Sequence, residues 1–248
     1  MDMLTEDNWD QHWEQFAQSA EIGPTPRYRR QLIASLFDFK PPGNAVRFLE
    51  IGSGTGEFAR EFRHCYSEAS YLGLELSQRG VAIAQRRVPG AHFLQRNLMQ
   101  PVSLDEIKYG ATHVLCSEVL EHLDDPSTLL RNSRVCCAAG CRLIITVPGG
   151  PMNAFYKYIG HRRHYSPSQL SALLERSGFE VESAFGAGFP FFNLLRVFLA
   201  MRGLKVVSDV SGPPPAMVRV GGLLFNALFR LNSRHSGWQT IAVARYLG

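Results

Sequence analysis

The 248-residue sequence lacks the features that indicate a membrane-spanning or secreted protein. It contains no apolar run that reaches the ~20 uninterrupted residues of a membrane span. Its first ten residues are acidic and polar, so no secretory signal peptide is expected. The five cysteines are an odd number without framework spacing, which predicts reduced thiols in a cytoplasmic protein.

The sequence also lacks recognisable metal-binding and nucleic-acid-binding patterns. No CxxC pair occurs and no histidine completes a zinc set, so no metal site is expected. The net charge of +4 is modest, and no Lys/Arg cluster suggests a nucleic-acid partner. The positive excess lies in residues 186–236, whose local charge is +5 with Asp209 as the single acid.

Apolar, β-prone runs alternate with helical stretches through the middle of the chain. Strands are predicted at 46–50, 70–75, 91–95, 111–117 and 141–147. Continuous apolar strands separated by helices indicate a parallel sheet covered on both faces, and right-handed connections make it doubly wound. Ligands of such α/β sheets bind beyond the carboxyl ends of the strands.

The remaining segments complete a single domain, expected to span residues 1–248. Two helices, at 5–20 with Thr5 as a cap and from 27 to about Phe39, form an N-terminal cap of residues 1–40. A helix ending at Ser177 precedes a strand at 179–185, and a last strand at 238–246 is expected beside it at the sheet edge. Residues 188–237 do not fit this pattern and are interpreted as a helical insertion with apolar helices at 189–202 and 216–231.

A glycine-rich stretch gives the clearest indication of a ligand. Residues 46–56 read VRFLEIGSGTG, so an apolar run ends in Glu50 and glycines follow at 52, 54 and 56. Such a turn lets backbone N–H groups approach a ligand closely. The spacing is GxGxG, whereas a dinucleotide site would have GxGxxG. Glu75 ends the second strand, where a carboxylate can accept both hydroxyls of a ribose.

Four segments resemble successive motifs of the class I S-adenosylmethionine-dependent methyltransferases. They read FLEIGSGTGEF, YLGLELS, CSEVLEHLDDP and GCRLIITVPGG, and the resemblance covers about residues 25–187 and 238–246. It implies a Rossmann-like, seven-stranded, mostly parallel sheet with an antiparallel last strand. It also implies that the cofactor is S-adenosyl-L-methionine and the product S-adenosyl-L-homocysteine.

The resemblance assigns parts of the cofactor to particular residues. The methionine part lies over the three glycines, Glu75 binds the ribose, and the adenine lies near Asn97 and Leu98. Family members commonly have Asp at position 97, but an amide can still pair with adenine. Arg29 falls where related enzymes bind the cofactor carboxylate, although Arg27 and Arg30 compete for this role. The implied cofactor-binding residues are Glu50, Gly52, Ser53, Gly54, Gly56, Glu75, Leu76, Asn97, Leu98, Ser117 and Arg29.

Three histidines are candidates for the catalytic base. Glu118 and His122 are four residues apart and are expected on one helical face, to contact substrate or to brace the loop. Residues 161–167, HRRHYSP, resemble a segment of small-molecule methyltransferases, including those that methylate hydroxyls in quinone biosynthesis. Methyl transfer to oxygen needs a base, which His161 or His164 can supply, with Tyr165 as a positioning group. A solvated basic loop is the competing interpretation.

The insertion and the rim of the site are expected to choose the acceptor. Broad apolar helices with a basic margin suit a lid over an apolar substrate, a peripheral contact with anionic lipid, or a covering layer or homodimer surface. The candidate substrate-binding residues are Tyr165, Arg163, Phe189 and Phe192. The sequence thus predicts a methyltransferase acting on a small, apolar or aromatic acceptor, most simply at oxygen. N- or C-methylation of a natural product, an NAD(P)-dependent oxidoreductase and a cofactor-binding protein without transfer activity are the alternatives.

Overall fold

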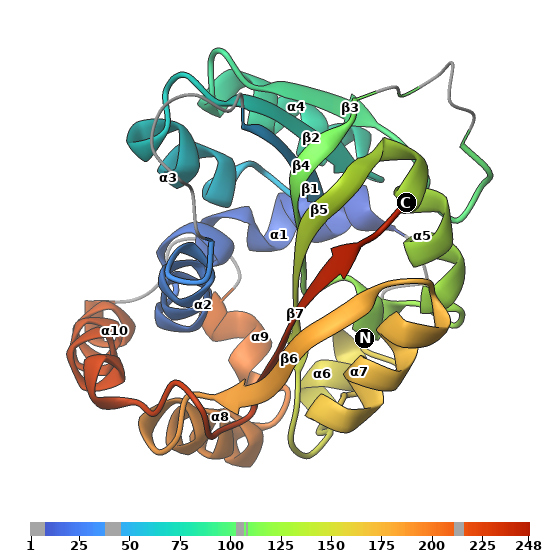
Figure 1. Cartoon of the computed structure of the whole chain (residues 1–248). Helices are drawn as coiled ribbons and strands as arrows, with labels where there is room; N and C mark the ends of the chain where they lie inside the picture. Colours follow the sequence, from blue (N-terminus) through green and yellow to red (C-terminus); the bar gives the residue numbers. More distant parts are fainter. Residues whose placement is uncertain (1–7, 38–45, 103–106, 108, 211–215) are drawn as a thin grey trace.

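The computed structural model describes residues 8–37, 46–102, 107, 109–210 and 216–248. Its centre is a seven-stranded sheet in the order β3-β2-β1-β4-β5-β7-β6 (Figure 1). The strands are β1 (Arg47–Ile51), β2 (Ser70–Glu75), β3 (His92–Gln95), β4 (Ala111–Ser117), β5 (Cys137–Pro148), β6 (Glu180–Ala187) and β7 (Gln239–Tyr246). The predicted α/β sheet is therefore confirmed.

The strand order creates a crevice at the centre of the sheet. The five strands from β3 to β5 are mutually parallel, and β7 runs antiparallel to both of its neighbours. The chain leaves β1 in one direction toward β2 and β3, and then returns to place β4 on the other side of β1. The loops that follow β1 and β4 therefore diverge above adjacent strand ends, which is the usual ligand position in such sheets.

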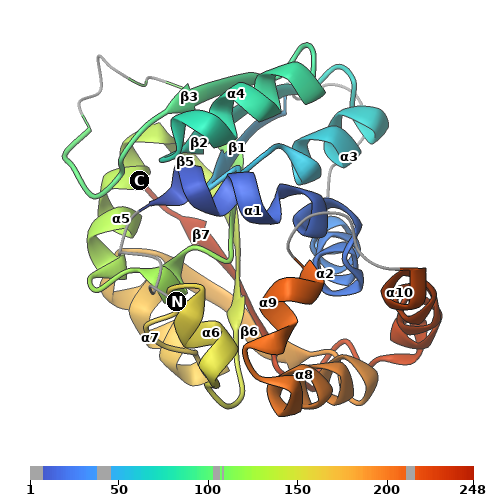
Figure 2. The same cartoon turned by 180° about the vertical axis from the view of Figure 1, so that it is seen from behind.

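Helices cover both faces of the sheet (Figures 1 and 2). The helices are α1 (Trp9–Ile22), α2 (Pro24–Ala34), α3 (Glu57–Cys65), α4 (Gln78–Arg87), α5 (Pro126–Ser133), α6 (Ala154–Tyr158), α7 (Pro167–Arg176), α8 (Phe191–Arg202), α9 (Lys205–Val210) and α10 (Ala216–Leu228). In Figure 2, α1 lies across the molecule next to α4. No helix among the described residues is long and apolar enough to cross a membrane.

Alternate residues of the central strands belong to two separate cores, as the pleat of a sheet requires. On one face, Leu49 and Ile51 pack with leucines of α5 and α7. On the other face, Phe48 packs with Phe58 and Phe62 of α3, and side chains from α2 and α8 join the same cluster. Because both faces are buried, the strands carry the continuous apolar runs seen in the sequence.

Several boundaries differ from the sequence-based predictions. The first helix begins at Trp9, with Asn8 as its cap, whereas Thr5 lies outside the described residues. The strand expected at 141–147 begins at Cys137, directly after a short 3-10 turn. The five-residue helix α6 was not predicted, because it is too short to show a hydrophobic period. The insertion contains α9 between the two predicted helices.

The prediction for the last strand is wrong in one respect. It does pair with the strand at 179–185, but β7 lies between β5 and β6, so the edge is formed by β6. The burial of the two strands explains this order. All residues of β7 from Gln239 to Ala244 are buried, whereas β6 exposes Glu180 and Glu182 to solvent. A continuous apolar strand belongs inside a sheet, and a strand with exposed charges at its edge.

Candidate cofactor and acceptor site

The glycine loop after β1 is held against β2 and is crowded on two sides. The backbone N–H groups of Gly52 and Ser53 both donate to the carbonyl of Leu74, at 2.8 and 3.1 Å. Gly54 has φ +54°, and a Cβ at this position would lie 2.8 Å from the Trp13 ring. A Cβ on Gly52 would lie 2.3 Å from a methyl group of Val119. The loop therefore needs glycine both for its backbone conformation and for space.

Glu75 links the loop after β1 to the loop after β2. Its Oε2 accepts from the N–H of Gly54 at 2.8 Å, and its Oε1 accepts from the N–H of Ser77 at 2.9 Å. Burial raises the pKa of this carboxyl group, whereas the two N–H donors oppose that shift. Each oxygen keeps a second lone pair, so the carboxylate can still accept hydroxyl groups of a ligand.

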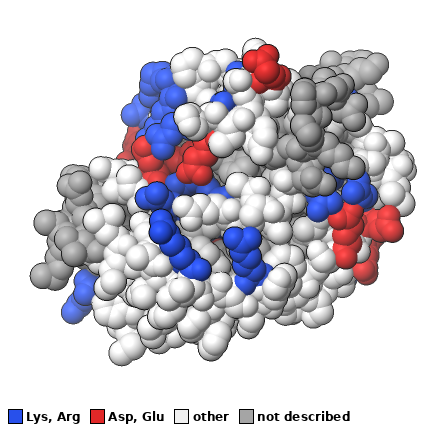
Figure 3. Space-filling model, turned by 60° about the vertical axis from the view of Figure 1, so that its left-hand side comes forward, with Lys and Arg blue, Asp and Glu red and all other residues white. Residues whose placement is uncertain are grey.

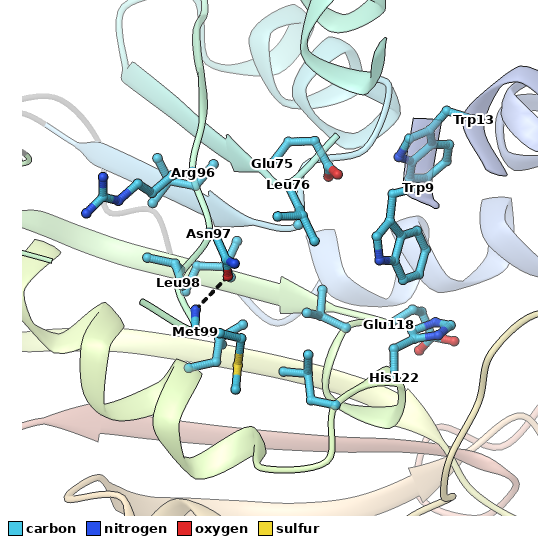
Figure 4. A pocket seen from close by; sticks show the side chains of 16 residues that line it. Trp9, Trp13, Glu75, Leu76, Arg96, Asn97, Leu98, Met99, Glu118 and His122 are labelled. Carbon is cyan, nitrogen blue, oxygen red and sulfur yellow. Dashed lines mark hydrogen bonds between the residues drawn. The ribbon is translucent and has the colours of Figure 1, made fainter. Parts of the chain in front are cut away.

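A cavity with an empty volume of about 640 Å³ opens beside Glu75 (Figure 4). Five of the predicted cofactor residues and one predicted catalytic residue line it, namely Gly52, Glu75, Leu76, Asn97, Leu98 and His122. The remaining lining residues are Trp9, Trp13, Ile51, Leu74, Arg96, Met99, Glu118, Val119, Leu123 and Leu129. The structure thus gathers residues from the ends of β1, β2, β3 and β4 around one space.

Helix α1 forms a wall of this cavity that the sequence analysis did not assign to the site. Trp9 and Trp13 project into the cavity from successive turns (Figure 4). Asp10, also on α1, accepts hydrogen bonds from the Ser77 hydroxyl and from the N–H of Arg79 at 3.0 Å. The sequence signal was present as two tryptophans four residues apart, but their spacing fits an ordinary core-facing helix equally well.

The cavity suits the adenosine part of the cofactor. Leu76, after β2, and Leu98, after β3, offer apolar surface to the cavity, and Glu75 lies next to the glycine loop through its bond to Gly54. The Oδ1 atom of Asn97 accepts from the N–H of Met99 at 2.9 Å, so its amide nitrogen remains available as a donor. The cavity therefore offers a carboxylate that can hold the ribose and apolar walls that can hold the adenine. Both features fit S-adenosylmethionine, the cofactor that the sequence implies.

Other predicted cofactor residues shape the site without lining the cavity. Ser53 is buried within the loop, and Gly56 caps α3 with φ +84°. The hydroxyl of Ser117 lies 2.8 Å from that of Thr146. Glu50 is buried below the loop, where it accepts a hydrogen bond from the Tyr71 hydroxyl. Burial, with smaller effects from nearby carboxylates, raises the pKa of Glu50 to about 8.

Arg29 reaches the site through Glu118. Its Nη1 lies 3.1 Å from Glu118 Oε2, and the other Glu118 oxygen accepts from the Gln239 amide at 2.9 Å. Glu118 has φ +58°, a left-handed conformation that is uncommon for a side chain other than glycine. The expectation that Glu118 and His122 share a helical face is wrong, because only a 3-10 turn forms, at Leu120–His122. Both side chains nevertheless line the cavity.

The three candidate histidines form a cluster behind the cavity. His161 Nδ1 lies 3.3 Å from His164 Nε2, and the His161 ring packs edge-on against His122 with centroids 4.7 Å apart. Burial lowers the pKa of His122 to about 3, and it lowers the pKa values of His161 and His164 as well. The imidazoles are therefore neutral near pH 7. Only His122 lines the cavity, with Trp9 against its ring.

The predicted substrate residues do not line the cofactor cavity. Arg163, His164 and Tyr165 line a second pocket of about 650 Å³ beside α7. Within it the Tyr165 side chain is buried, and its hydroxyl donates to the carbonyl of Leu120. Phe189 is exposed to solvent, whereas Phe192 is 2% exposed and packs in a core with Tyr28 and Phe229.

Comparisons with known proteins identify the family. A family model described as a methyltransferase domain matches residues 24–184, which is more than half of the chain. No curated protein matches. A putative methyltransferase of Haloferax volcanii, solved with the Trm112 activator, is 15% identical over 98% of this chain and 99% of its own, with a TM-score of 0.63.

Two further solved structures share the fold. A methyltransferase of Thermotoga maritima, described as a possible histamine N-methyltransferase, is 18% identical over 95% of this chain and 93% of its own, with a TM-score of 0.57. The [4+2]-cyclase SpnF is 19% identical over 88% of this chain and 79% of its own, with a TM-score of 0.56. These identities show a common fold only. With the family model and the cavity at the strand ends, the chain belongs to the S-adenosylmethionine-dependent methyltransferases.

Proposed function

We propose that this methyltransferase transfers the methyl group of S-adenosylmethionine to a small, apolar or aromatic acceptor, at an oxygen atom. One observation carries the proposal. The residues suited to the cofactor and the aromatic wall of α1 border the same cavity, so donor and acceptor can lie in contact. Trp9, Val119 and Leu123 make the wall next to the cofactor residues largely apolar.

Different residues around the cavity would bind different parts of the cofactor. S-adenosylmethionine supplies an electrophilic methyl group on a positively charged sulfur. Glu75 would hold the ribose, the amino-acid part would lie over the glycine loop, and Arg29 would bind the cofactor carboxylate from beside Glu118. Holding two reactants in contact accounts for much of the rate increase in such a transfer.

A hydroxyl acceptor also has to lose its proton. His122 is the one candidate histidine that lines the cavity, and the bond of its Nδ1 to the Gly160 carbonyl, at 3.2 Å, leaves its Nε2 free. A pKa of about 3 makes His122 a weak base toward a hydroxyl. The proposed reaction therefore depends mainly on orientation, with His122 as a hydrogen-bond acceptor for the substrate.

The proposal can be tested with a labelled methyl donor. Calorimetry with S-adenosylhomocysteine first establishes cofactor binding, and label transfer from S-adenosylmethionine is then measured with matched phenols, anilines and carbon acids. Preferential labelling of the phenols is expected. Labelling of anilines alone would overturn the oxygen assignment, and cofactor binding without transfer to any acceptor would overturn transferase activity. Cofactor binding and methyl transfer have to be measured separately, because SpnF, named for a cyclase activity, has the same fold.

A further inference from the structure

Glu121 is a buried acid without a hydrogen-bond partner. Its side chain is 0% exposed, and neither carboxylate oxygen has a partner among the described residues. Neither nearby guanidinium group donates to Glu121, since Arg29 pairs with Glu118, and Arg196 donates to Tyr156 and two backbone carbonyls while its Nη2 has no partner among the described residues. A buried, unpaired carboxyl group is costly and is normally satisfied by a donor, a water or a metal ion.

A proton on Glu121 would not satisfy the group. A carboxylic acid needs an acceptor for its O–H, and the Nε2 atom of His122 lies 3.9 Å from Glu121 Oε1, beyond hydrogen-bond reach. The backbone around Glu121 is fixed, because its carbonyl accepts from the N–H of Arg162 at 2.8 Å. The carboxyl group is therefore held in place, and no side chain among the described residues donates to either of its oxygens.

The hydrogen bonds of the neighbouring histidines leave one nitrogen lone pair on each of two rings, those of His122 and His161. A carbonyl only accepts, so His122 must carry its proton on Nδ1 to donate to Gly160, and its Nε2 is left unprotonated. By the same reasoning His164 donates from Nδ1 to the Gly150 carbonyl at 3.0 Å, and its Nε2 becomes an acceptor. His161 then donates to that nitrogen from Nδ1, so the Nε2 of His161 also carries a lone pair.

Three acceptors thus converge with no donor among them. One ligand atom from each of Glu121, His122 and His161 lies within 4.8 Å of the others. From this geometry we propose that Glu121, His122 and His161 bind a divalent transition-metal ion, with Gly160 and His164 orienting the two imidazoles. Hydrogen bonds from the far side of each ligating ring are the usual support of such sites.

The ligand set selects the kind of ion. Two imidazoles and one carboxylate suit Zn²⁺, Mn²⁺, Fe²⁺ or a similar ion, whereas Mg²⁺ prefers oxygen ligands alone. Ligand atoms around tetrahedral zinc are about 3.4 Å apart, so small side-chain rotations would close the site. Three protein ligands leave a position open, as in catalytic rather than structural zinc sites.

The open position connects the ion to the proposed reaction. His122 is both a ligand and a lining residue of the cofactor cavity, so the ion would lie at the border of that cavity. A metal-bound hydroxyl loses its proton more readily than a free one. The ion would therefore promote deprotonation of the acceptor, for which His122 alone is too weak a base. This role rests on the proposed function, whereas binding of the ion does not. No metal site was predicted from the sequence, because α5, a 3-10 turn, β5 and α6 separate Glu121 and His122 from His161 in the chain.

Metal binding can be measured independently of activity. After treatment with a chelator, the full chain is titrated with Zn²⁺ by calorimetry and by thermal melting. One equivalent is expected to bind and to raise the Tm, with no comparable shift from Mg²⁺ at the same concentration. Glu121→Gln and His161→Asn should each weaken Zn²⁺ binding at least 100-fold, whereas His64→Ala, an exposed histidine on α3, should bind as the parent does. Zinc binding that is unchanged in Glu121→Gln would overturn the site.

Two further measurements keep the test decisive. Binding of S-adenosylhomocysteine by each variant shows that it has folded. X-ray absorption of the zinc-loaded parent should show nitrogen and oxygen neighbours at about 2.0–2.2 Å, and sulfur neighbours would overturn the site by placing the ion on the cysteines. Zinc binding without S-adenosylhomocysteine binding would contradict the proposed function alone. Binding of S-adenosylhomocysteine without zinc binding would contradict the metal site alone.

Discussion

Arg29 of α2 forms an ion pair with Glu118 at the end of β4, with 3.1 Å between Nη1 and Oε2. Glu118 adopts a left-handed backbone conformation and also accepts from Gln239 of β7. The pair therefore connects α2 to the end of β4 and, through Gln239, to β7. It also places a guanidinium group with unused donors beside the cofactor cavity.

Removal of Arg29 should weaken cofactor binding. We expect Arg29→Ala to reduce the affinity for S-adenosylhomocysteine about tenfold, because a charge-assisted contact is lost and Glu118 is released. Calorimetry at two salt concentrations measures the effect. Arg27→Ala is the matched control, since Arg27 lies exposed on the same helix. Equal affinities of the two variants would contradict a role for Arg29.

Removal of the Glu75 carboxylate should affect both stability and ligand affinity. Glu75→Ala leaves the N–H groups of Gly54 and Ser77 without their partner, which costs about 1–3 kcal/mol for each buried group. We expect a lower Tm and at least tenfold weaker binding of S-adenosylhomocysteine. Glu68→Ala, an exposed acid before β2, should match the parent. Folded Glu75→Ala that binds as tightly as the parent would remove Glu75 from the cofactor site.

The contact between Gly54 and Trp13 can be separated from backbone strain. Gly203 has φ +55° and nothing within 4 Å of its missing Cβ, whereas Gly54 has φ +54° and the Trp13 ring at 2.8 Å. Gly203→Ala should cost about 1–3 kcal/mol of unfolding free energy through the backbone alone, since its ψ of −137° also favours glycine. Gly54→Ala should cost more, and Trp13→Ala should remove the excess in a double-mutant cycle measured by chemical denaturation. Equal costs for the two glycine substitutions would contradict packing of α1 on the loop.

Glu50 should make stability depend on pH. Its pKa is about 8 in the folded protein, against 4.5 for an unperturbed Glu, so folding favours its protonated form. The stabilisation is complete below pH 4.5 and is lost as the pH rises to 8, at about 1.4 kcal/mol per pH unit. Relative to the parent, Glu50→Gln should therefore gain stability across this range in denaturation experiments. A difference that does not change with pH would show that Glu50 ionises normally.

The apolar surface of α8 and α10 predicts an interaction with anionic lipid. Met201 is 82% exposed and Leu223 is 67% exposed, and Arg202, Lys205 and Arg230 lie exposed among such side chains. Figure 3 shows Lys and Arg side chains within a broad uncharged area, whereas the Asp and Glu side chains lie above it and at the right of the view. We expect co-sedimentation with anionic vesicles that decreases with salt.

Substitutions can locate this lipid contact. Met201→Glu should abolish co-sedimentation, whereas Leu247→Glu, at an exposed site near the end of β7, should leave it unchanged. A protein that remains in solution at low salt would contradict the lipid contact. A mass that doubles with concentration under those conditions would instead assign the surface to a homodimer.

Much of the fold follows from local sequence patterns. The limits of β2 and β4 agree with prediction, because each strand is bounded by turn residues and has an unbroken apolar pattern. The short helix α6 and the edge position of β6 depend on packing and could not be read from such patterns. The same division applies to the site, where Glu75 and Gly52 are placed by strand ends, whereas Trp13 is placed by how α1 packs.

The sequence by itself determined the α/β class, the glycine loop and the acid that follows the second strand, because these features are encoded in contiguous residues. Only the tertiary structure decided that α1 closes the cavity and that Arg29 meets Glu118. It also decided that Glu121 and His122 face His161 across the loops after β4 and β5. These relationships join residues far apart in the chain and depend on side-chain direction, which hydrophobic periodicity does not specify.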